Sequence, residues 1–221
     1  MIAVAIDGPA GAGKSTIAKK IAKELGFVYI DTGALYRTIA YDMVKRRISP
    51  SEDAAVKDAL SSLQIELAFQ DGEQHVYLDG EDVSSFIRTP EISMAASSFS
   101  ALPPVRAFLL ELQRDMARRH NVIMDGRDIG TVVLPNADIK IFLTASPEDR
   151  AKRRHQELLE KGMESDYASV LEDIKKRDDN DANRPIAPLR PSQDSLIVDT
   201  TGNTLEKSIS LLSRMIKERL R

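Results

Sequence analysis

The chain has 221 residues, with 31 Lys and Arg against 34 Asp and Glu, so its formal net charge is −3. This length fits one large domain, and 42% hydrophobic with 29% charged residues is typical of a globular chain rather than a disordered one. The absence of cysteine excludes disulfides, thiol catalysis and Cys-ligated metal sites. The slight negative charge argues against general binding of nucleic acid. No apolar run approaches the ~18 residues of a membrane span, and the first residues do not have the pattern of a signal peptide. We therefore expect a cytoplasmic protein.

The predicted elements alternate between short strands and longer helices. Strands are expected at residues 2–6, 27–30, 122–124, 139–143 and 196–198, where apolar residues run almost without interruption. Helices are expected after residue 13 as far as Gly26, around 35–47, and at about 103–119, 147–161, 166–180 and 204–219. Strands separated by helices predict a parallel sheet with helices on both faces.

One segment departs from this alternation. Apolar and polar side chains alternate over residues 63–69, as in a half-buried strand, and residues 74–78 form a second strand. Asp71 and Gly72 between them predict a turn, and Asp79 with Gly80 ends the second strand. We therefore expect a small antiparallel insert in an otherwise parallel fold.

A complete phosphate-loop motif, G-x-x-x-x-G-K-[ST], follows the first predicted strand and opens the first predicted helix. Its glycines let successive backbone N–H groups turn around an anion, and the helix N-terminus adds the positive end of its dipole. Lys14 is expected to reach the outer phosphates of a nucleotide, and the Ser15 hydroxyl is expected to ligate Mg²⁺. The residues expected to bind the nucleotide phosphates are Gly8, Pro9, Ala10, Gly11, Ala12, Gly13, Lys14, Ser15 and Thr16.

Charged residues follow two further strands, at the edge where open parallel sheets bind ligands. Arg37 comes shortly after the strand at 27–30, and Arg127 comes directly after the strand at 122–124. A lone arginine is usually a solvated surface cation, but converging guanidinium groups are what a second phosphate and a transferring phosphoryl group require. Asp125 has the position of a residue that holds Mg²⁺ through water. Its alternative role is to cap the turn that follows.

A GTPase-type switch is the alternative within the phosphate-loop class. Residues Asp199 to Gly202 fit the D-x-x-G pattern of such switches, but they follow the last predicted strand, and no N-K-x-D motif occurs in the chain. A strand end with a turn glycine explains the same residues. A nucleotide-binding module without turnover is the third alternative.

The motifs taken together resemble those of the bacterial cytidylate (CMP/dCMP) kinases. The resemblance extends over nearly the whole chain, through IDGPAGAGKST, IDTGALYR, MDGRDIGTVVLPNADIKIFL and KKRDDNDANRPIAPL. It implies an α/β P-loop NTPase fold with a five-stranded parallel sheet core flanked by helices, a small antiparallel NMP-binding insert and a helical lid. The chain 1–221 is then a single NMP-kinase domain, with its core at 1–35, 101–147 and 170–221, the insert at about 36–100 and the lid at about 148–169.

The resemblance also implies an activity. Such kinases transfer the γ-phosphoryl group of ATP to CMP or dCMP, with Mg²⁺, and the resemblance places the acceptor phosphate among Arg37, Arg127 and Arg184, with Thr32 nearby. The phosphate oxygen that attacks is already anionic, so no general base is expected. UMP or AMP as the acceptor is the alternative within this family. We expect a monomer whose partners are small-molecule substrates, without nucleic-acid or membrane partners.

The base and sugar of the acceptor have their own expected residues. The resemblance places Ser97, Arg106 and Asp128 around the cytosine, and Arg177 and Asp181 near the sugar. Cytosine offers an amino donor beside two acceptors, so a carboxylate can accept from the amino group while an arginine and a serine donate. Uracil would place an acceptor opposite the carboxylate, and buried mismatches of this kind are strongly rejected.

A lid that closes over both nucleotides would keep out water, which would otherwise accept the phosphoryl group. Arg150, Arg153 and Arg154 lie on the predicted lid helix, where Arg153 or Arg154 is expected to reach the ATP phosphates, with Arg153 as the catalytic candidate. The alternative is a solvated face in which Asp149 and Glu157 pair with Arg153 at i,i+4 spacing.

Overall fold

A computed structural model describes residues 1–70 and 73–220 of the chain. Its larger sheet has five parallel strands in the order β2-β6-β1-β7-β8. The strands are β1 (Ala3–Asp7), β2 (Val28–Asp31), β6 (Val122–Gly126), β7 (Ile139–Thr144) and β8 (Leu196–Asp199). The expectation of a parallel α/β sheet is confirmed, and each expected strand lies within two residues of its observed bounds.

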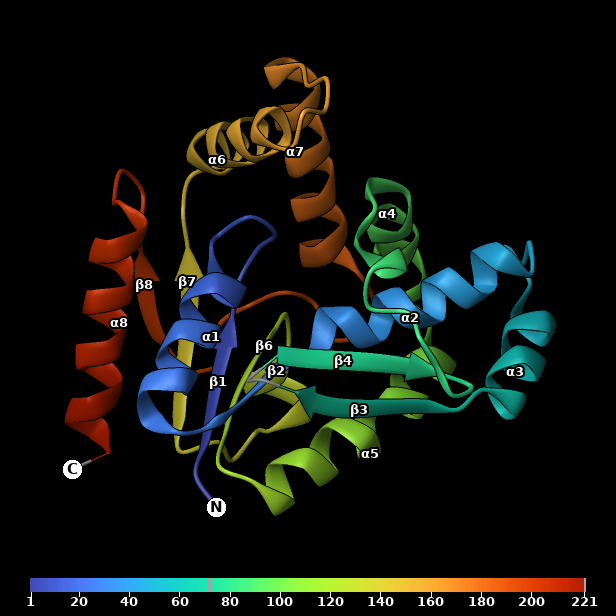
Figure 1. Ribbon diagram of the computed structural model, residues 1–221, viewed down its shortest axis with the longest axis horizontal. Helices are drawn as coiled ribbons and strands as arrows, with labels where there is room; N and C mark the ends of the chain where they lie inside the picture. Colours follow the sequence, from blue (N-terminus) through green and yellow to red (C-terminus); the bar gives the residue numbers. More distant parts are fainter. Residues whose placement is uncertain (71–72, 221) are drawn as a thin grey trace.

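Helices cover both faces of this sheet (Figure 1). On one face α1 (Lys14–Leu25) and α8 (Leu205–Arg219) pack against the sheet through a core that includes Ile21, Ile141 and Leu212. On the other face α5 (Pro103–Arg119) packs on the strand residues Ile30 and Met124. Because both faces are covered, the strands are apolar over most of their length, and this made them predictable.

The smaller sheet is antiparallel, with strands β3 (Ile65–Gln70), β4 (Glu73–Leu78) and β5 (Glu81–Asp82). It belongs to a second hydrophobic core, to which α2 (Thr32–Lys45), α3 (Asp53–Ser62) and α4 (Pro90–Phe99) also contribute. The 3₁₀ turn η1 (Phe86–Arg88) joins β5 to α4. The two expected strands of the insert are confirmed, with a short third strand in addition. The expected turn at residues 71–72 lies outside the described residues.

Two helices stand above the carboxyl edge of the parallel sheet (Figure 1). These are α6 (Pro147–Glu160), whose first turn Ser146 caps by accepting from Asp149 N at 3.2 Å, and α7 (Tyr167–Asn183), which Asp166 caps in the same way. In the stretches 1–70 and 73–220, no helix is both long and apolar enough to cross a membrane.

Four helical elements of the described residues were not predicted: α3, η1, α4 and the π-helical turn η2 (Ile129–Val133) that follows β6. The start of α4 has a recognisable signal, since the Thr89 hydroxyl accepts from Ile92 N at 3.2 Å and Pro90 occupies the first helical position. No comparable signal marks η2. Its shape depends on contacts with other elements, and these are described below.

The conformation of the phosphate loop predicts an unequal response to two matched substitutions. A Cβ at Gly8 would lie 1.9 Å from Leu143 O, which is backbone and cannot yield, whereas a Cβ at Gly26 meets nothing within 4 Å. Both glycines have positive φ, so strain alone predicts that Gly26→Ala costs about 1–2 kcal/mol. Gly8→Ala should cost more than about 4 kcal/mol, as measured by urea unfolding. Equal losses in the two variants would contradict this reading of the loop.

Candidate active site

The phosphate loop lies between β1 and α1, at the edge of the sheet that faces α6 and α7 (Figure 1). Gly8, Gly11 and Gly13 have φ of 148°, 74° and 86°, values that only glycine adopts without strain. Gly13 is the N-cap of α1 and has no side chain to accept the first N–H groups of that helix. These N–H groups and the helix dipole make the loop a site for an anion.

Lys14 is the buried cation of this loop. Its side chain is 6% exposed, and Nζ donates to Pro9 O at 2.7 Å. Burial, followed by the positive charge of Arg127, lowers the pKa of Lys14 to about 7, while Asp125 and Asp181 act in the opposite direction. A bound phosphate would restore the charged form of this amine, because an adjacent negative charge stabilises it.

Asp125, at the end of β6, connects the loop to the neighbouring strand. Its carboxylate accepts from Ser15 Oγ at 2.8 Å and from Tyr29 OH at 2.9 Å. Burial, followed by the charge of Asp31, raises the pKa of Asp125 to about 6. The recorded partners of the carboxylate are these two hydroxyl groups rather than a backbone N–H of the following turn, so the capping role considered above is not observed.

Ser15 and Asp125 supply oxygen donors of the kind that Mg²⁺ prefers. Over residues 1–70 and 73–220 no group of three or more His, Asp or Glu side chains could hold a metal by itself. A hydroxyl and one carboxylate beside a phosphate site fit Mg²⁺, which is commonly held by one or two protein groups together with the phosphates of its substrate.

Arg37 and Arg127 each have a carboxylate partner on this edge. Arg37 Nη2 donates to Asp31 Oδ2 at 2.9 Å, and Asp31 also caps α2 by accepting from Ala34 N at 2.9 Å. Arg127 Nε donates to Asp181 Oδ2 at 2.7 Å. The first pair connects β2 to α2, and the second connects the segment after β6 to α7.

Asp128 lies between two more arginines. Arg106 donates to Asp128 Oδ2, and Arg184 Nη2 donates to Asp128 Oδ1 at 3.3 Å. The guanidinium of Arg106 also lies 5.5 Å from the centre of the Tyr36 ring. Asp128, Arg106 and Arg184 are each less than 9% exposed. Burial raises the pKa of Asp128 although both arginines act to lower it.

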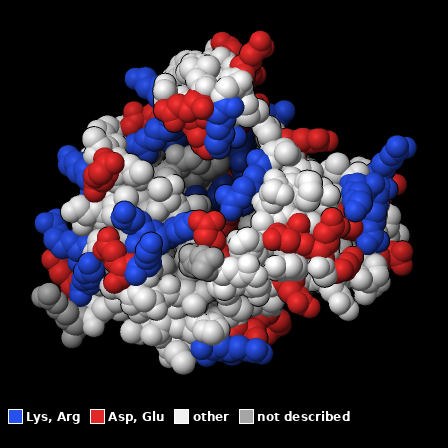
Figure 2. All heavy atoms as spheres, in the orientation of Figure 1, with Lys and Arg blue, Asp and Glu red and all other residues white. Residues whose placement is uncertain are grey.

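These pairs are close enough to share one electrostatic field. Arg127 acts on Lys14, on Asp128 and on Arg177, and Arg37 also acts on Arg177. The expected arginines therefore meet at one edge of the sheet. Figure 2 shows lysine and arginine side chains around a hollow below the α6–α7 pair. A cavity of about 860 Å³ extends from Lys14 to Arg37 and Arg177.

Three buried polar atoms have no hydrogen-bond partner in the described part of the chain: Arg37 Nε and Arg177 Nε, whose residues line this cleft, and Ser97 Oγ in α4. Such atoms are rare in folded proteins and call for a partner. Burial, followed by the charge of Arg127, lowers the pKa of Arg177 to about 10. Ser97 lies in α4, well past its first turn, so it is not the cap of that helix. The cleft thus presents donors that a nucleotide could satisfy.

The arginines of α6 differ in their contacts. Arg153 Nη2 donates to Thr200 O at 3.1 Å and lies 3.4 Å from Asp149 Oδ2, while Glu157 pairs with Arg154 and Lys161 instead. Arg153 and Arg154 both line the cleft. Of the two carboxylates expected to flank Arg153, only Asp149 pairs with it.

Asp199, the first residue of the D-x-x-G pattern, closes its own turn. Its carboxylate accepts from Thr201 N at 2.8 Å and from Thr201 Oγ1 at 2.6 Å, and Gly202 follows with φ of 71°. These contacts are those of a strand end with a turn glycine, which was the alternative to a GTPase-type switch.

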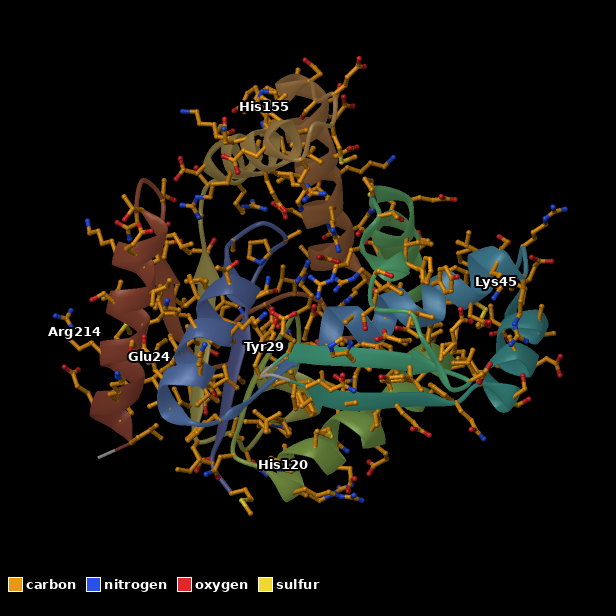
Figure 3. The ribbon with its side chains drawn as sticks, viewed as in Figure 1. Glu24, Tyr29, Lys45, His120, His155 and Arg214 are labelled. Atoms are coloured by element: carbon orange, nitrogen blue, oxygen red, sulfur yellow. The ribbon has the colours of Figure 1, made fainter. Side chains whose placement is uncertain are left out.

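The histidines have no common site. Figure 3 shows His120 and His155 at opposite ends of the molecule, and His75 lies on β4, where it pairs with Asp82.

Sequence reasoning missed two groups that belong to this edge. Arg88 in η1 and Met94 in α4 line the cleft beside Arg37. The side chain of Gln74 accepts from Asp31 N at 2.9 Å and donates to Asp31 O at 3.3 Å, so β4 is fastened to the end of β2. The helix start at Thr89 was an available signal for the first group. No sequence pattern indicates the second.

Asp7 was also missed. It ends β1, is 3% exposed, and accepts from Ile129 N at 2.7 Å and from Gly130 N at 2.8 Å. These two bonds hold the start of η2, directly after Asp128. Burial raises the pKa of Asp7 to about 6, against the effect of the two N–H donors.

The glycine loop and the cluster of buried cations opposite it define a P-loop nucleotide-binding protein of the kinase type. The family model described as cytidylate kinase matches residues 4–218. The chain therefore belongs to the cytidylate kinase family.

Individual relatives agree with this. A cytidylate kinase of Caldicellulosiruptor bescii is 50% identical over 220 residues, which cover 98% of this chain and 97% of that protein. A cytidylate kinase of Carboxydothermus hydrogenoformans is 47% identical over 213 residues, 96% of each chain. Among solved structures, an uncharacterized protein from Eubacterium ventriosum has a TM-score of 0.53 at 12% identity, covering 98% of this chain and 99% of that one. This last likeness supports the fold alone.

The buried carboxyl of Asp7 predicts a pH dependence of stability. Its pKa is about 6 in the folded chain against an ordinary 3.8, so the folded state keeps a proton that the unfolded state loses. The resulting stabilisation disappears as the pH rises through about 6. Asp7→Asn removes this titration, although it weakens the bonds to η2 at every pH. The stability difference between the two chains should shrink from about pH 4 to about pH 6.5 in urea unfolding. A constant difference would contradict it.

Proposed function

We propose that this chain transfers the γ-phosphoryl group of ATP to CMP or dCMP, giving ADP and CDP or dCDP. The observation that supports this most directly is a set of three cations that line one cleft of about 860 Å³: Lys14, which is buried, with Arg37 and Arg177, which are half-buried. A nucleotide hydrolase needs one phosphate site, whereas a cleft with cations at both ends suits two phosphate-bearing substrates. Membership of the cytidylate kinase family supports the same reaction.

The donor is proposed to be ATP, with its outer phosphates in the loop of residues 8–16. Lys14 binds the β- and γ-phosphates, and the N–H groups at the start of α1 bind the remaining oxygens. Ser15 would hold Mg²⁺ there, and Asp125 would hold it through water. When bound, this ion neutralises phosphate charge and polarises the bond that is transferred.

The acceptor phosphate is proposed to bind Arg37, Arg127 and Arg184, with Thr32 nearby. At present Arg127 and Arg184 donate to Asp181 and Asp128, and a phosphate would compete with these carboxylates for the same guanidinium protons. Charge-assisted bonds to a phosphate are strong and often bidentate. The carboxylates therefore hold the arginines in place and can exchange them for the ligand.

Base recognition is assigned to Asp128, Arg106 and Ser97, and sugar recognition to Arg177 and Asp181. Within residues 1–70 and 73–220, Ser97 Oγ and Arg177 Nε have no hydrogen-bond partner, and this supports the assignment because both are buried donors in need of one. Asp128 is suited to accept from the cytosine amino group, which uracil lacks.

The reaction needs alignment and charge neutralisation but no general base, because the attacking phosphate oxygen is anionic. Lys14 and the arginines stabilise the charge of the transferring group, and Arg153 is the proposed contribution of the lid. The lid at about 148–169 is proposed to close against the core at 1–35, 101–147 and 170–221, and the insert at about 36–100 against the acceptor. Closure excludes water and prevents ATP hydrolysis. We further propose that the protein is cytoplasmic, since the nucleotides it uses are held in the cytoplasm, and that it is a monomer.

One assay tests the proposal: ADP formation from ATP and Mg²⁺ with CMP, dCMP, UMP or AMP as the added acceptor. The proposal expects turnover that depends on CMP or dCMP and is much slower with the other two. ADP formation without an acceptor would favour a hydrolase, and ATP binding without turnover would favour a non-catalytic module.

Lys14→Ala tests the donor site. Loss of a buried cation aimed at the phosphates should lower the transfer rate by at least about 100-fold, with little change in far-ultraviolet circular dichroism. Lys20→Ala is the matched control, since Lys20 lies on the same helix and is exposed. Phosphoryl transfer by Lys14→Ala at a near-normal rate would contradict the assignment of Lys14 to the donor site.

Asp128→Asn tests base recognition. The amide can donate to the O4 of uracil, which the carboxylate cannot do, so the ratio of kcat/KM for CMP to that for UMP should fall at least about tenfold. Both rates are measured on the same preparation, so partial unfolding cancels from the ratio. An unchanged ratio would show that Asp128 does not distinguish the bases.

A further inference from the structure

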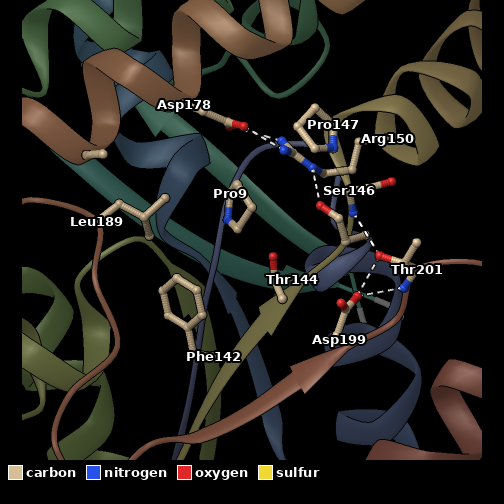
Figure 4. A pocket seen from close by; sticks show the side chains of 12 residues that line it. Pro9, Phe142, Thr144, Ser146, Pro147, Arg150, Asp178, Leu189, Asp199 and Thr201 are labelled. Atoms are coloured by element: carbon tan, nitrogen blue, oxygen red, sulfur yellow. Dashed lines mark hydrogen bonds and ion pairs between the residues drawn. The ribbon is translucent and has the colours of Figure 1, made fainter.

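The guanidinium group of Arg150, in the first turn of α6, lies where three segments meet (Figure 4). Its Nε donates to Ala145 O at 2.9 Å, at the end of β7. Nη1 donates to Ala10 O in the phosphate loop at 3.0 Å and to Asp178 Oδ1 in α7 at 2.9 Å. Nη2 donates to Asp178 Oδ2 at 2.5 Å. One side chain thus fastens the loop, the lid helix and α7 together.

Burial makes these bonds rigid. Arg150 is 2% exposed, and a buried guanidinium is stable only when its donors have partners. The planar fork matches the two oxygens of Asp178, and this geometry fixes direction as well as distance. The loop also packs on the aliphatic part of the side chain, since a Cβ on Gly11 would lie 3.4 Å from Arg150 Cβ.

Asp178 connects this junction to the acceptor side. It directly follows Arg177 in α7, and Asp181 lies one turn beyond Arg177. At 3.6 residues per turn Arg177 and Asp181 share a face of the helix, while Asp178 lies about 100° round from Arg177. The face of α7 that carries Arg177 and Asp181 therefore meets the cations of the cleft, and the adjacent face, which carries Asp178, meets Arg150.

We propose that Arg150 and Asp178 form a positioning pair, which sets the donor loop at a fixed distance from the helix that holds the acceptor. The pair rests on the proposed function, because it aligns the two nucleotides of that reaction. Neither side chain is placed on a nucleotide; Arg150 acts through Ala10, and Asp178 acts through Arg177 and Asp181. In-line transfer is sensitive to misplacement of about 1 Å, so loosening the pair slows the transfer step more than it weakens the binding of either substrate.

The test is a steady-state comparison of Asp178→Asn, Arg150→Gln and the double variant, with ATP and CMP each varied. We expect kcat to fall at least about tenfold in each single variant, while both KM values change less than about threefold. The double variant should be no slower than Arg150→Gln, because both changes remove one contact. Asp178→Asn leaves the bonds of Arg150 to Ala10 and Ala145 in place, so it remains a test if Arg150→Gln fails to fold.

Lys175→Gln is the matched control. Lys175 joins α7 to Glu148 of α6 at 3.5 Å, with both side chains 54% exposed. The kcat of Lys175→Gln should stay unchanged. A loss of kcat in Asp178→Asn then cannot be explained by a weaker contact between α6 and α7 alone. Unchanged kcat in the variants, multiplied losses in the double variant, or losses that follow the unfolded fraction would overturn the pair. Absence of CMP-dependent turnover in the unaltered chain would overturn the proposed function and the pair with it.

Discussion

Positive charge held out of water at one edge of a parallel sheet is the constraint on which this structure depends. Lys14, Arg106 and Arg184 are each less than 9% exposed, and isolated cations in such places are strongly destabilising. Carboxylates offset this: Asp128 accepts from both arginines, while Asp125 acts on Lys14. Removing one partner of such a buried ion pair destabilises the fold more than replacing both partners with apolar side chains. The carboxylates therefore hold these cations in position at this edge of the sheet.

The fold supplies these charges from segments that are far apart in the sequence. The strand order puts β1 between β6 and β7, so the phosphate loop and the segment after β6 lie at one edge. The helix α7 adds Asp181, which pairs with Arg127, and Asp178, which pairs with Arg150. The antiparallel sheet adds Gln74, which bonds to the backbone of Asp31. The proposed donor and acceptor sites thus share supports, and we expect a change in either to affect both.

The sequence predicted the parallel core well, because its strands are buried on both faces and its phosphate loop matches a complete glycine-rich motif. It indicated the arginines of the cleft only through motifs and a family resemblance. The sequence could not predict the ion pairs that these arginines form, because Arg127 and Asp181 are 54 positions apart and no local pattern connects them. The sequence placed Arg150 with Arg153 and Arg154 on the lid helix, and its burial against the phosphate loop follows only from the tertiary structure. The shape of η2 depends in the same way on Asp7, more than a hundred residues earlier.

The binding of two nucleotides in one cleft is tested most directly by calorimetric titration with a compound that joins adenosine to cytidine, 5′ to 5′, through five phosphates. If two nucleotides meet by their phosphates in this cleft, one molecule should bind per chain, at least about 100-fold more tightly than ATP or CMP alone. The uridine counterpart should bind more weakly, since it opposes an acceptor to Asp128. Two molecules per chain, or an affinity no greater than that for ATP, would contradict the account.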